Sequence, residues 1–509
     1  MPGTRLYPAT RHRTAQHGAV VVLFAAVLLA LIGFAGLALE TGQLFNRRAE
    51  VQTIADALAM AAAKELNGSP AGVAAALAAA SERLSNTTDG LHYQYGKARA
   101  GWNEAALSFA QTAHGPWLDS ATASSAPQGV AYVKVDPRQL EAQLTQVPTI
   151  FMRALSATFA LVTVGAVAVA GPSAINVLPL AICAMSAQPA AARGSELVQY
   201  GFRRGISYDL MKLDPEDTDG VGVHYLIDPL AAPGRTGAAA DFSLDNIKPS
   251  VCTGTLAMAR VSGGPLTVQG PFPLAALYTQ LNARFGQYAA PCNPITAPPD
   301  ANVKAYSVSS FFNTASSWMH STTPPLSTQA ASAYPATPSG SAQKLWTYAD
   351  QSPLPANTGP DKYGPLWSYA RAVPYAAYTA GIPEPANGYT PFPATQANWT
   401  LFYPANTGSG SPSLKTATYP AGATATPYLA SSGAFFAAPP AGLLALRGRR
   451  VLNVPLLSCP VPSGVVTTAT VLAIGKFFMT VPADSTHLYA EFAGIAAEQS
   501  LSAMLELQQ

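Results

Sequence analysis

Residues 18–39 read GAVVVLFAAVLLALIGFAGLAL, and residues 40–66 continue as ETGQLFNRRAEVQTIADALAMAAAKEL. The first stretch holds 22 residues without a charge. As a helix it would be about 33 Å long at ~1.5 Å per residue, which matches a bilayer hydrocarbon core of about 30 Å. The sequence therefore predicts a transmembrane helix over residues 18–39, preceded by a basic tail over residues 1–17.

The second stretch predicts an amphipathic helix over residues 40–67 that continues the membrane helix. Apolar side chains recur there at steps of three, four or seven, and such spacing places them on one face of a helix. This apolar stripe has two possible uses: packing against the chain's own domain, or packing against sister helices in a homo-oligomer. The residues of the stripe are Leu44, Val51, Ile54, Ala55, Leu58, Ala62 and Leu66.

Charge around the apolar stretch predicts its orientation. Three arginines and no acid precede it, whereas the two arginines that follow are offset by two glutamates. The positive-inside rule then predicts a cytoplasmic amino terminus and a body on the other side. A cleaved secretory signal is the alternative, since residues 36–38 are small or apolar, but its apolar region is normally about 7–15 residues long. We therefore expect an uncleaved, single-pass anchor.

The composition of the rest excludes some classes of protein. Charged residues are 11%, where about 25% is usual, and the chain has 44 prolines and 40 glycines. The net charge of +2 includes no basic run in the body, so a nucleic-acid-binding surface is not expected. The pattern predicts an α+β body with many short strands and Pro-rich loops.

Four cysteines all follow the apolar stretch, and none lies in a Cys-x-x-Cys pair, so zinc and thioredoxin-type sites lack their spacing. An even number in an exported body favours disulfides. Of the three connectivities we prefer Cys252–Cys292, within one internal segment, and Cys183–Cys459, across its flanks; four buried free thiols are the alternative.

Two apolar segments that end in cysteine resemble one another: NVLPLAIC at 176–183 and LNVPLLSC at 452–459. We interpret them as neighbouring strands of one α+β body, with a first half over residues 68–195 and a second over 451–509. Residues 196–450 would form a Pro/Gly/Trp-rich insertion of strands and loops. The charge-free run 154–182 is long enough for a second membrane helix, but its β-branched residues and Gly-Pro break favour two strands.

The stretch of residues 16–63 resembles the N-terminal segment of the TadE/TadG-like family, envelope proteins of the Flp (tight-adherence) pilus system. That pattern has a Gly-Ala start, a membrane helix, an acidic residue with Gly and an aromatic at its exit, and a helix with Gln-x-x-Ala-Asp-Ala. The resemblance implies a bacterial inner-membrane protein that faces the periplasm and works with other pilus-assembly proteins. The matching positions are Gln16, Gly18, Ala19, Glu40, Gly42, Phe45, Gln52, Ala55, Asp56 and Ala57.

Two departures from the family pattern matter. Prepilin-like relatives are cut after a glycine that is followed five residues later by Glu, whereas Leu23 stands at that distance from Gly18. Processing like a pilin is therefore not expected. Larger TadG-like proteins carry a von Willebrand A domain with an Asp-x-Ser-x-Ser metal motif, and that string does not occur in this chain.

Motifs of catalysis do not stand out. The sequence has no His-x-x-x-His, Gly-x-Ser-x-Gly or P-loop string, so we expect a non-catalytic protein without a cofactor or a metal, with a structural or minor-pilin-like role in pilus assembly and adhesion. The alternative is an anchored carbohydrate-binding adhesin or carbohydrate-active enzyme that stacks sugars on exposed tryptophans. The candidate tryptophans are Trp318, Trp346, Trp367 and Trp399.

Overall fold

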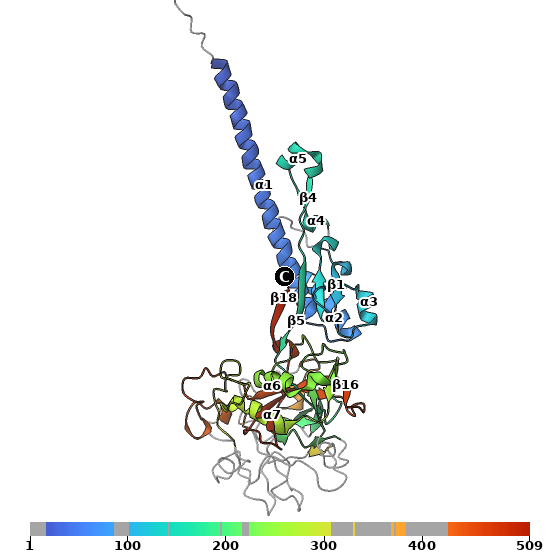
Figure 1. Ribbon diagram of the computed structural model, residues 1–509, viewed down its shortest axis with the longest axis vertical. Helices are drawn as coiled ribbons and strands as arrows, with labels where there is room; N and C mark the ends of the chain where they lie inside the picture. Colours follow the sequence, from blue (N-terminus) through green and yellow to red (C-terminus); the bar gives the residue numbers. More distant parts are fainter. Residues whose placement is uncertain are drawn as a thin grey trace, which may run out of the picture. The chain divides into compact units, whose positions relative to one another are not determined.

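The computed structural model describes residues 17–85, 101–140, 142–193, 196–215, 223–306, 329–330, 368–370, 373–382 and 426–508. The described chain combines one very long N-terminal helix with a mixed body of helices and sheets (Figure 1), which is the α+β class predicted. It divides into two compact units. The hairpin unit takes the described parts of Met1–Leu58, Ser81–Ala106 and Val135–Ala168, and the barrel unit takes those of Ala59–Ala80, Leu107–Lys134 and Val169–Gln509.

Helix α1 runs without a break from His17 to Ala63, so the predicted membrane and amphipathic helices are one element. It ends four residues earlier than predicted: a turn over residues 64–65 follows it, and Gly68 has φ +73°, which a helix does not allow. A Cβ at Gly68 would lie 2.1 Å from the carbonyl oxygen of Pro233, so only glycine fits. Ser69 Oγ then accepts the N–H of Gly72 at 3.2 Å and caps helix α2, Pro70–Ser85.

The hairpin unit also contains a small antiparallel hairpin. Strand β3, Gln146–Pro148, pairs with β4, Leu161–Thr163, and the chain between them folds into helix α5, Phe151–Leu155, and a 3₁₀ turn over Ala157–Phe159. Helix α4, Ala142–Thr145, leads into β3. The charge-free run from residue 154 therefore begins with this hairpin and not with a second membrane helix.

The barrel unit is built on a sheet with the strand order β10-β17-β16-β13-β12-β6-β15, in which β15 also pairs with β16. The pairing β16-β13-β12-β6-β15 therefore closes on itself into a small barrel. All these pairs are antiparallel except β6 with β15, where Ile182 pairs with Leu456 and Cys183 with Leu457. This is the neighbouring placement that the two cysteine-ended segments predicted.

Helices and smaller sheets complete the barrel unit. Helices α6 and α7 pack together, and a four-stranded sheet has the order β1-β2-β5-β18. The helices are α3 Ser120–Ser125, α6 Leu244–Thr253 and α7 Leu274–Leu281, and the strands are β1 Leu107–Ala110, β2 Tyr132–Val135, β5 Ala168–Ile175, β6 Leu180–Cys183, β7 Ala191–Arg193, β8 Glu196–Gln199, β9 Phe202–Arg203, β10 Ser207–Asp209, β11 Leu213–Asp214, β12 His224–Ile227, β13 Pro265–Gln269, β14 Gln329–Ala330, β15 Val451–Leu457, β16 Val466–Met479, β17 Tyr489–Ile495 and β18 Ser502–Gln508.

The predicted boundary at residue 196 is wrong, because strands β10, β12 and β13 lie inside the seven-stranded sheet. Side chains from 202–285 also share one buried apolar cluster with those of β6, β15, β16 and β17. The strands concerned have only three to five residues, too few to show alternation against a Pro- and Gly-rich background. The stretch up to about residue 306 is therefore part of the body and not an insertion into it.

Candidate functional site

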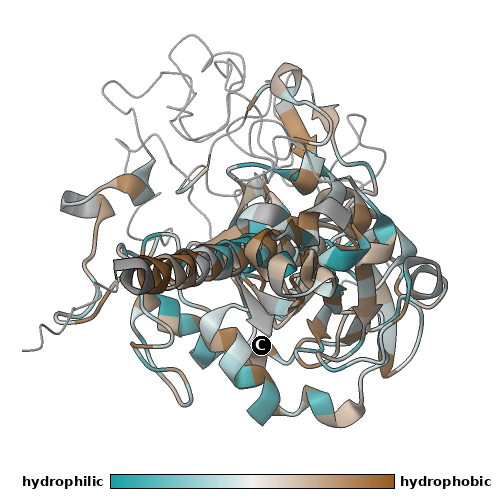
Figure 2. Ribbon diagram, turned by 90° about the horizontal axis from the view of Figure 1, so that it is seen from above, coloured by the Kyte–Doolittle hydropathy of each residue, from teal (hydrophilic) through white to brown (hydrophobic). Residues whose placement is uncertain are grey.

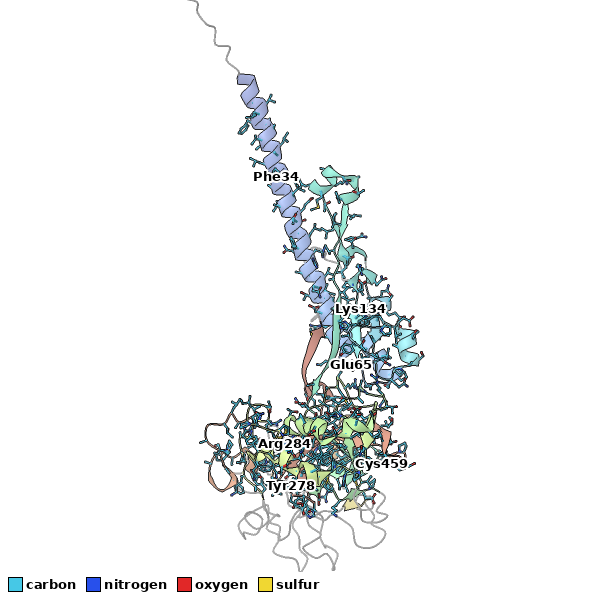
Figure 3. The ribbon with its side chains drawn as sticks, viewed as in Figure 1. Phe34, Glu65, Lys134, Tyr278, Arg284 and Cys459 are labelled. Carbon is cyan, nitrogen blue, oxygen red and sulfur yellow. A yellow bond between two sulfur atoms is a disulfide. The ribbon has the colours of Figure 1, made fainter. Side chains whose placement is uncertain are left out.

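The N-terminal half of α1 is apolar and exposed. Figure 2 shows it mostly in the hydrophobic colour, and Phe34, labelled in Figure 3, is 72% exposed. From Val21 to Leu39 every large apolar side chain except Leu37 is exposed. Among the described residues, α1 is the one helix long and apolar enough to cross a membrane. A continuous apolar surface of this kind is stable in lipid and unfavourable in water.

The other half of α1 is packed inside the chain. The predicted stripe residues Val51, Ile54, Leu58 and Leu66 are each at most 2% exposed. Their burial is the use that packing against the chain's own domain predicts. Leu44, the first residue of the stripe, is half-buried, and a homo-oligomer through this helix stays a prediction.

Glu40 joins α1 to the hairpin at the end of the apolar half. Its carboxylate accepts three consecutive backbone N–H groups, those of Ile150, Phe151 at 2.6 Å and Met152 at 2.8 Å. These groups begin helix α5, and the first N–H groups of a helix have no partner within it. A carboxylate there satisfies them and complements the positive end of the helix.

One turn before Glu40, the aromatic ring of Phe151 lies on Gly36. A Cβ placed at Gly36 would be 2.3 Å from that ring, whereas a Cβ at Gly33 would meet nothing within 4 Å. Glycine is therefore required for the close contact at one position and not at the other. The Gly33-x-x-Gly36 spacing would also permit close approach of a second helix, but the hairpin already covers Gly36.

The other family-pattern residues lie on α1 in three different settings. Gln52 Nε2 donates to Asp56 Oδ1 at 2.7 Å and to the carbonyl of Val167 at 3.3 Å, so this pair contacts the far end of the hairpin segment. Gly42 is exposed, with space around it. Gly18 lies in the first turn of the helix.

Two disulfides cross-link the barrel unit. They are Cys183–Cys459, between the ends of β6 and β15, and Cys252–Cys292, between α6 and the loop after α7. These are the pairs that the sequence analysis preferred, and they use all four cysteines. The candidate residues Trp318, Trp346, Trp367 and Trp399 lie outside the described part of the chain.

Charged groups in the barrel unit are buried and hydrogen-bonded. Arg450, 0% exposed, donates to the carbonyls of Met479 and Thr480 and to those of residues 302 and 304, at 2.6–3.0 Å. Its guanidinium centre also lies 4.4 Å from the ring centroids of Phe285 and Phe478. Burial lowers the pKa of Arg450 to about 10. The group fastens loops to strand β16 and points into no cavity.

Glu491 on β17 is the second such group. It accepts the N–H groups of Ser368 at 2.6 Å, Tyr369 at 3.0 Å and Ala370 at 2.6 Å, and it is 0% exposed. Burial raises its pKa to about 7, against the three N–H bonds, which lower it. These three contacts with the chain's own backbone, together with a side-chain hydrogen bond with Ser368, indicate a structural role.

Asp209 and His487 form a further pair with acid–base potential, besides the carboxyl pair Asp228–Asp241, in which burial and then the Asp241 charge raise the pKa of Asp228. Asp209 Oδ2 lies 2.6 Å from His487 Nδ1, and burial raises the pKa of Asp209 against that bond. Asp209 Oδ1 also accepts the backbone N–H groups of Met211 and Leu488. The pair thus ties β10 to the turn before β17.

One cavity of about 550 Å³ lies in the barrel unit, lined by residues that include Gln111, Arg235 and Asp241. Within the described part of the chain, no group of three or more His, Cys, Asp and Glu side chains gathers as it would around a metal ion. The cavity is also lined by the hydroxyl-bearing residues Tyr132 and Thr236, and this lining by itself does not define a reaction.

The described residues thus define a class of protein: an α+β body with two disulfides that follows one exposed apolar helix, long enough to span a membrane. The family model described as "Putative Flp pilus-assembly TadE/G-like" matches residues 18–65. The N-terminal segment is therefore of the TadE/TadG-like type, as predicted. Comparison with curated proteins and with solved structures found no match.

Sequence reasoning missed the partner of Glu40. The motif marked the carboxylate, but its ligands are backbone N–H groups about 110 residues further along the chain, and backbone groups carry no side-chain signature. One signal was present: the segment PTIFMRAL, residues 148–155, contains no acidic residue that could cap its own helical turn. A helical turn without its own cap needs an acceptor from elsewhere.

Proposed function

We propose that this chain is a single-pass, membrane-anchored, non-catalytic component of Flp/Tad-type pilus assembly and surface adhesion. Its amino terminus lies in the cytoplasm, its barrel unit lies in the periplasm, and α1 crosses the bacterial inner membrane. The observation that carries the proposal is the exposed apolar half of α1 within a segment that matches the TadE/G-like family model. Its partners are the membrane and other pilus-assembly proteins.

Three further features support this function. The two disulfides in the barrel unit suit an oxidising compartment such as the periplasm. The stripe residues Val51, Ile54 and Leu58 of α1 are buried in their own chain, which suits a helix that is packed beyond its membrane-spanning half. The buried charges Arg450 and Glu491 hold backbone groups in place and serve the fold.

Topology tests the anchoring directly. A reporter that is active only outside the cytoplasm is fused after Asn67 and, separately, after Ser195. We expect activity at both positions. An inactive fusion at Asn67 would contradict the orientation, and an inactive fusion at Ser195 alone would require a second span.

Piliation tests the role. Deletion of the gene should abolish pili, and the full chain should restore them. The matched control is a chain in which a cleavable signal replaces residues 18–39, so that the body is exported but free. We expect this control to fail in rescue; pili that persist after the deletion would contradict the proposed role.

A further inference from the structure

The hairpin of residues 149–161 exposes apolar side chains beside the membrane helix. Ile150 is 78% exposed, Phe159 51% and Leu161 57%. Between Glu141 and Arg193 the chain carries a single charge, that of Arg153, which is exposed in α5. A soluble surface loop normally carries more polar groups than this, and a cluster of exposed apolar residues marks an interaction surface.

Two contacts fix the level of this hairpin along α1. The ring of Phe151 lies on Gly36, and the N–H groups of residues 150–152 bind Glu40. Gly36 belongs to the 22-residue charge-free stretch, and Glu40 is the first charge after it. The two contact points are about 6 Å apart along the helix axis at ~1.5 Å per residue. The tip therefore lies where the apolar stretch ends.

That level coincides with the boundary between acyl chains and headgroups if α1 spans the bilayer. The headgroup layer adds about 5–8 Å on each side of the hydrocarbon core. Interfacial elements bury their apolar face about 5–10 Å into this boundary. The exposed tip thus lies at the depth of the end of the apolar half of α1 that Gly36 and Glu40 mark.

We propose that the tip of the hairpin, Ile150, Phe159 and Leu161, inserts into the lipid interface of the leaflet that α1 leaves, as a second membrane contact. This inference rests on the proposed anchoring by α1. Arg153 lies at the same level and pairs with lipid phosphate. A second contact with lipid restrains the tilt of the hairpin unit against the bilayer, because tilting would lift the tip out of the interface, and it leaves rotation about the membrane normal free.

The contacts of Glu40 and Gly36 explain why the tip stays at this depth. Glu40 satisfies the N-terminal N–H groups of α5, which would otherwise enter the interface unpaired. The missing side chain of Gly36 lets the Phe151 ring lie directly on the helix. Gly36 and Glu40, the two residues that hold the tip in place, therefore both lie on α1, and Glu40 is also a residue of the family pattern.

Lipid-borne quenching in the full-length protein tests the proposal. All native cysteines are in disulfides, so an added cysteine is the one thiol that an environment-sensitive fluorophore labels. The probes are Ile150→Cys and Phe159→Cys, with Leu161→Cys as a second choice if either fails to fold. The protein is placed as single copies in phosphatidylethanolamine–phosphatidylglycerol nanodiscs with or without lipids that carry a quencher near the headgroup.

Two controls come from the same unit. Leu29→Cys lies in the middle of the apolar stretch and reports whether α1 is inserted. Val167→Cys has a similar apolar side chain, 45% exposed, at the other end of the hairpin segment. The Val167 carbonyl binds Gln52, which is about 18 Å beyond Glu40 along the helix, outside the headgroup layer.

We expect blue-shifted emission, and loss of most of it to the quencher, at positions 29, 150 and 159, with neither at 167. Quenching at 29 but water-like emission at 150 and 159 would overturn the interfacial tip and leave the anchor intact. Blue-shifted emission without lipid quenching at 150 and 159 would show protein cover, such as a second copy, and would also overturn it. An unquenched Leu29 probe would overturn the anchor, and the tip with it.

Discussion

The hairpin unit and the barrel unit each use a glutamate to bind three consecutive backbone N–H groups, but the two sites differ in what surrounds them. Glu491 is sealed in the barrel unit, among stacked aromatic rings and the buried Arg450. Glu40 lies at the end of an exposed apolar helix and holds a hairpin that has few other polar contacts. The same contact therefore stabilises a whole core in one place and sets the position of one tip in the other.

The barrel unit is also cross-linked, whereas the hairpin unit contains no cysteine. The bond Cys183–Cys459 closes a separation of 276 residues and Cys252–Cys292 one of 40. In the chain-entropy model these loops correspond to about 5.6 and about 3.9 kcal/mol. The comparison predicts that loss of a disulfide lowers the free energy of unfolding of the barrel unit, while the hairpin stays bound to α1.

The largest expected effect is therefore removal of the longer cross-link. The double variant Cys183→Ala/Cys459→Ala should lose more stability than Cys252→Ala/Cys292→Ala, by about 1.7 kcal/mol from loop length alone. Denaturant unfolding of the two variants measures the difference. Equal losses would show that the denatured chain or local packing, and not loop entropy, sets the contribution.

The next effect is truncation of the buried carboxylate. Glu491→Ala leaves three buried N–H groups without an acceptor, which we expect to cost about 3 kcal/mol or more. Thermal unfolding of the barrel unit measures it. Glu104→Ala is the matched control, since Glu104 is an exposed glutamate at a 3₁₀ turn and should change stability little. A neutral Glu491→Ala would mean that water replaces the carboxylate.

The contribution of Glu491 to the stability of the barrel unit should depend on pH. Burial raises the pKa of Glu491 from 4.5 to about 7, so between these values the folded state holds a proton that the unfolded state has lost. The contribution of this group to stability is then fully present below about pH 4.5 and declines as pH rises to about 7. Relative to Glu491→Gln, the wild type should lose roughly 1–3 kcal/mol over that range. A pH-independent difference would contradict the raised pKa.

Replacement of the Glu40 carboxylate by an amide should have a local effect. In Glu40→Gln one amide oxygen remains as acceptor, while the amide NH₂ faces backbone donors. We expect faster amide hydrogen exchange at residues 150–152 and an unchanged unfolding midpoint of the barrel unit. Glu50→Gln on the same helix is the control. A global loss of stability in Glu40→Gln would erase the distinction between the two glutamates.

The sequence predicts α1 well because its signals are local. A charge-free run and a helical stripe lie within one continuous stretch, and the structure buries the stripe. The pairing of β6 with β15 was also predictable, because the two strands resemble one another and each ends at a cysteine.

The rest depended on contacts that have no local signal. Arg450 is fully buried although it follows Arg449 in a polar segment, because four backbone carbonyls, those of Met479 in β16, of Thr480 and of residues 302 and 304, accept its donors. Strands β10 and β12 are too short to alternate visibly. Glu40 and Glu491 bind backbone N–H groups, which every residue except proline offers, so no residue pattern marks their partners.

Two glycines one turn apart on α1 provide the finest test of the tip. Gly36→Ala introduces a methyl group where the Phe151 ring lies, whereas Gly33→Ala points into open space. Both changes favour the helix by about 1 kcal/mol, so their difference reports the ring contact alone. We expect Gly36→Ala to displace Phe151 and to raise hydrogen exchange at residues 150–152, with Gly33→Ala unchanged. Because Phe151 is a side chain that can rotate away, the shift should be smaller than in Glu40→Gln. Identical exchange in the two alanine variants would show that the carboxylate of Glu40, and not the glycine surface, sets the position of the tip.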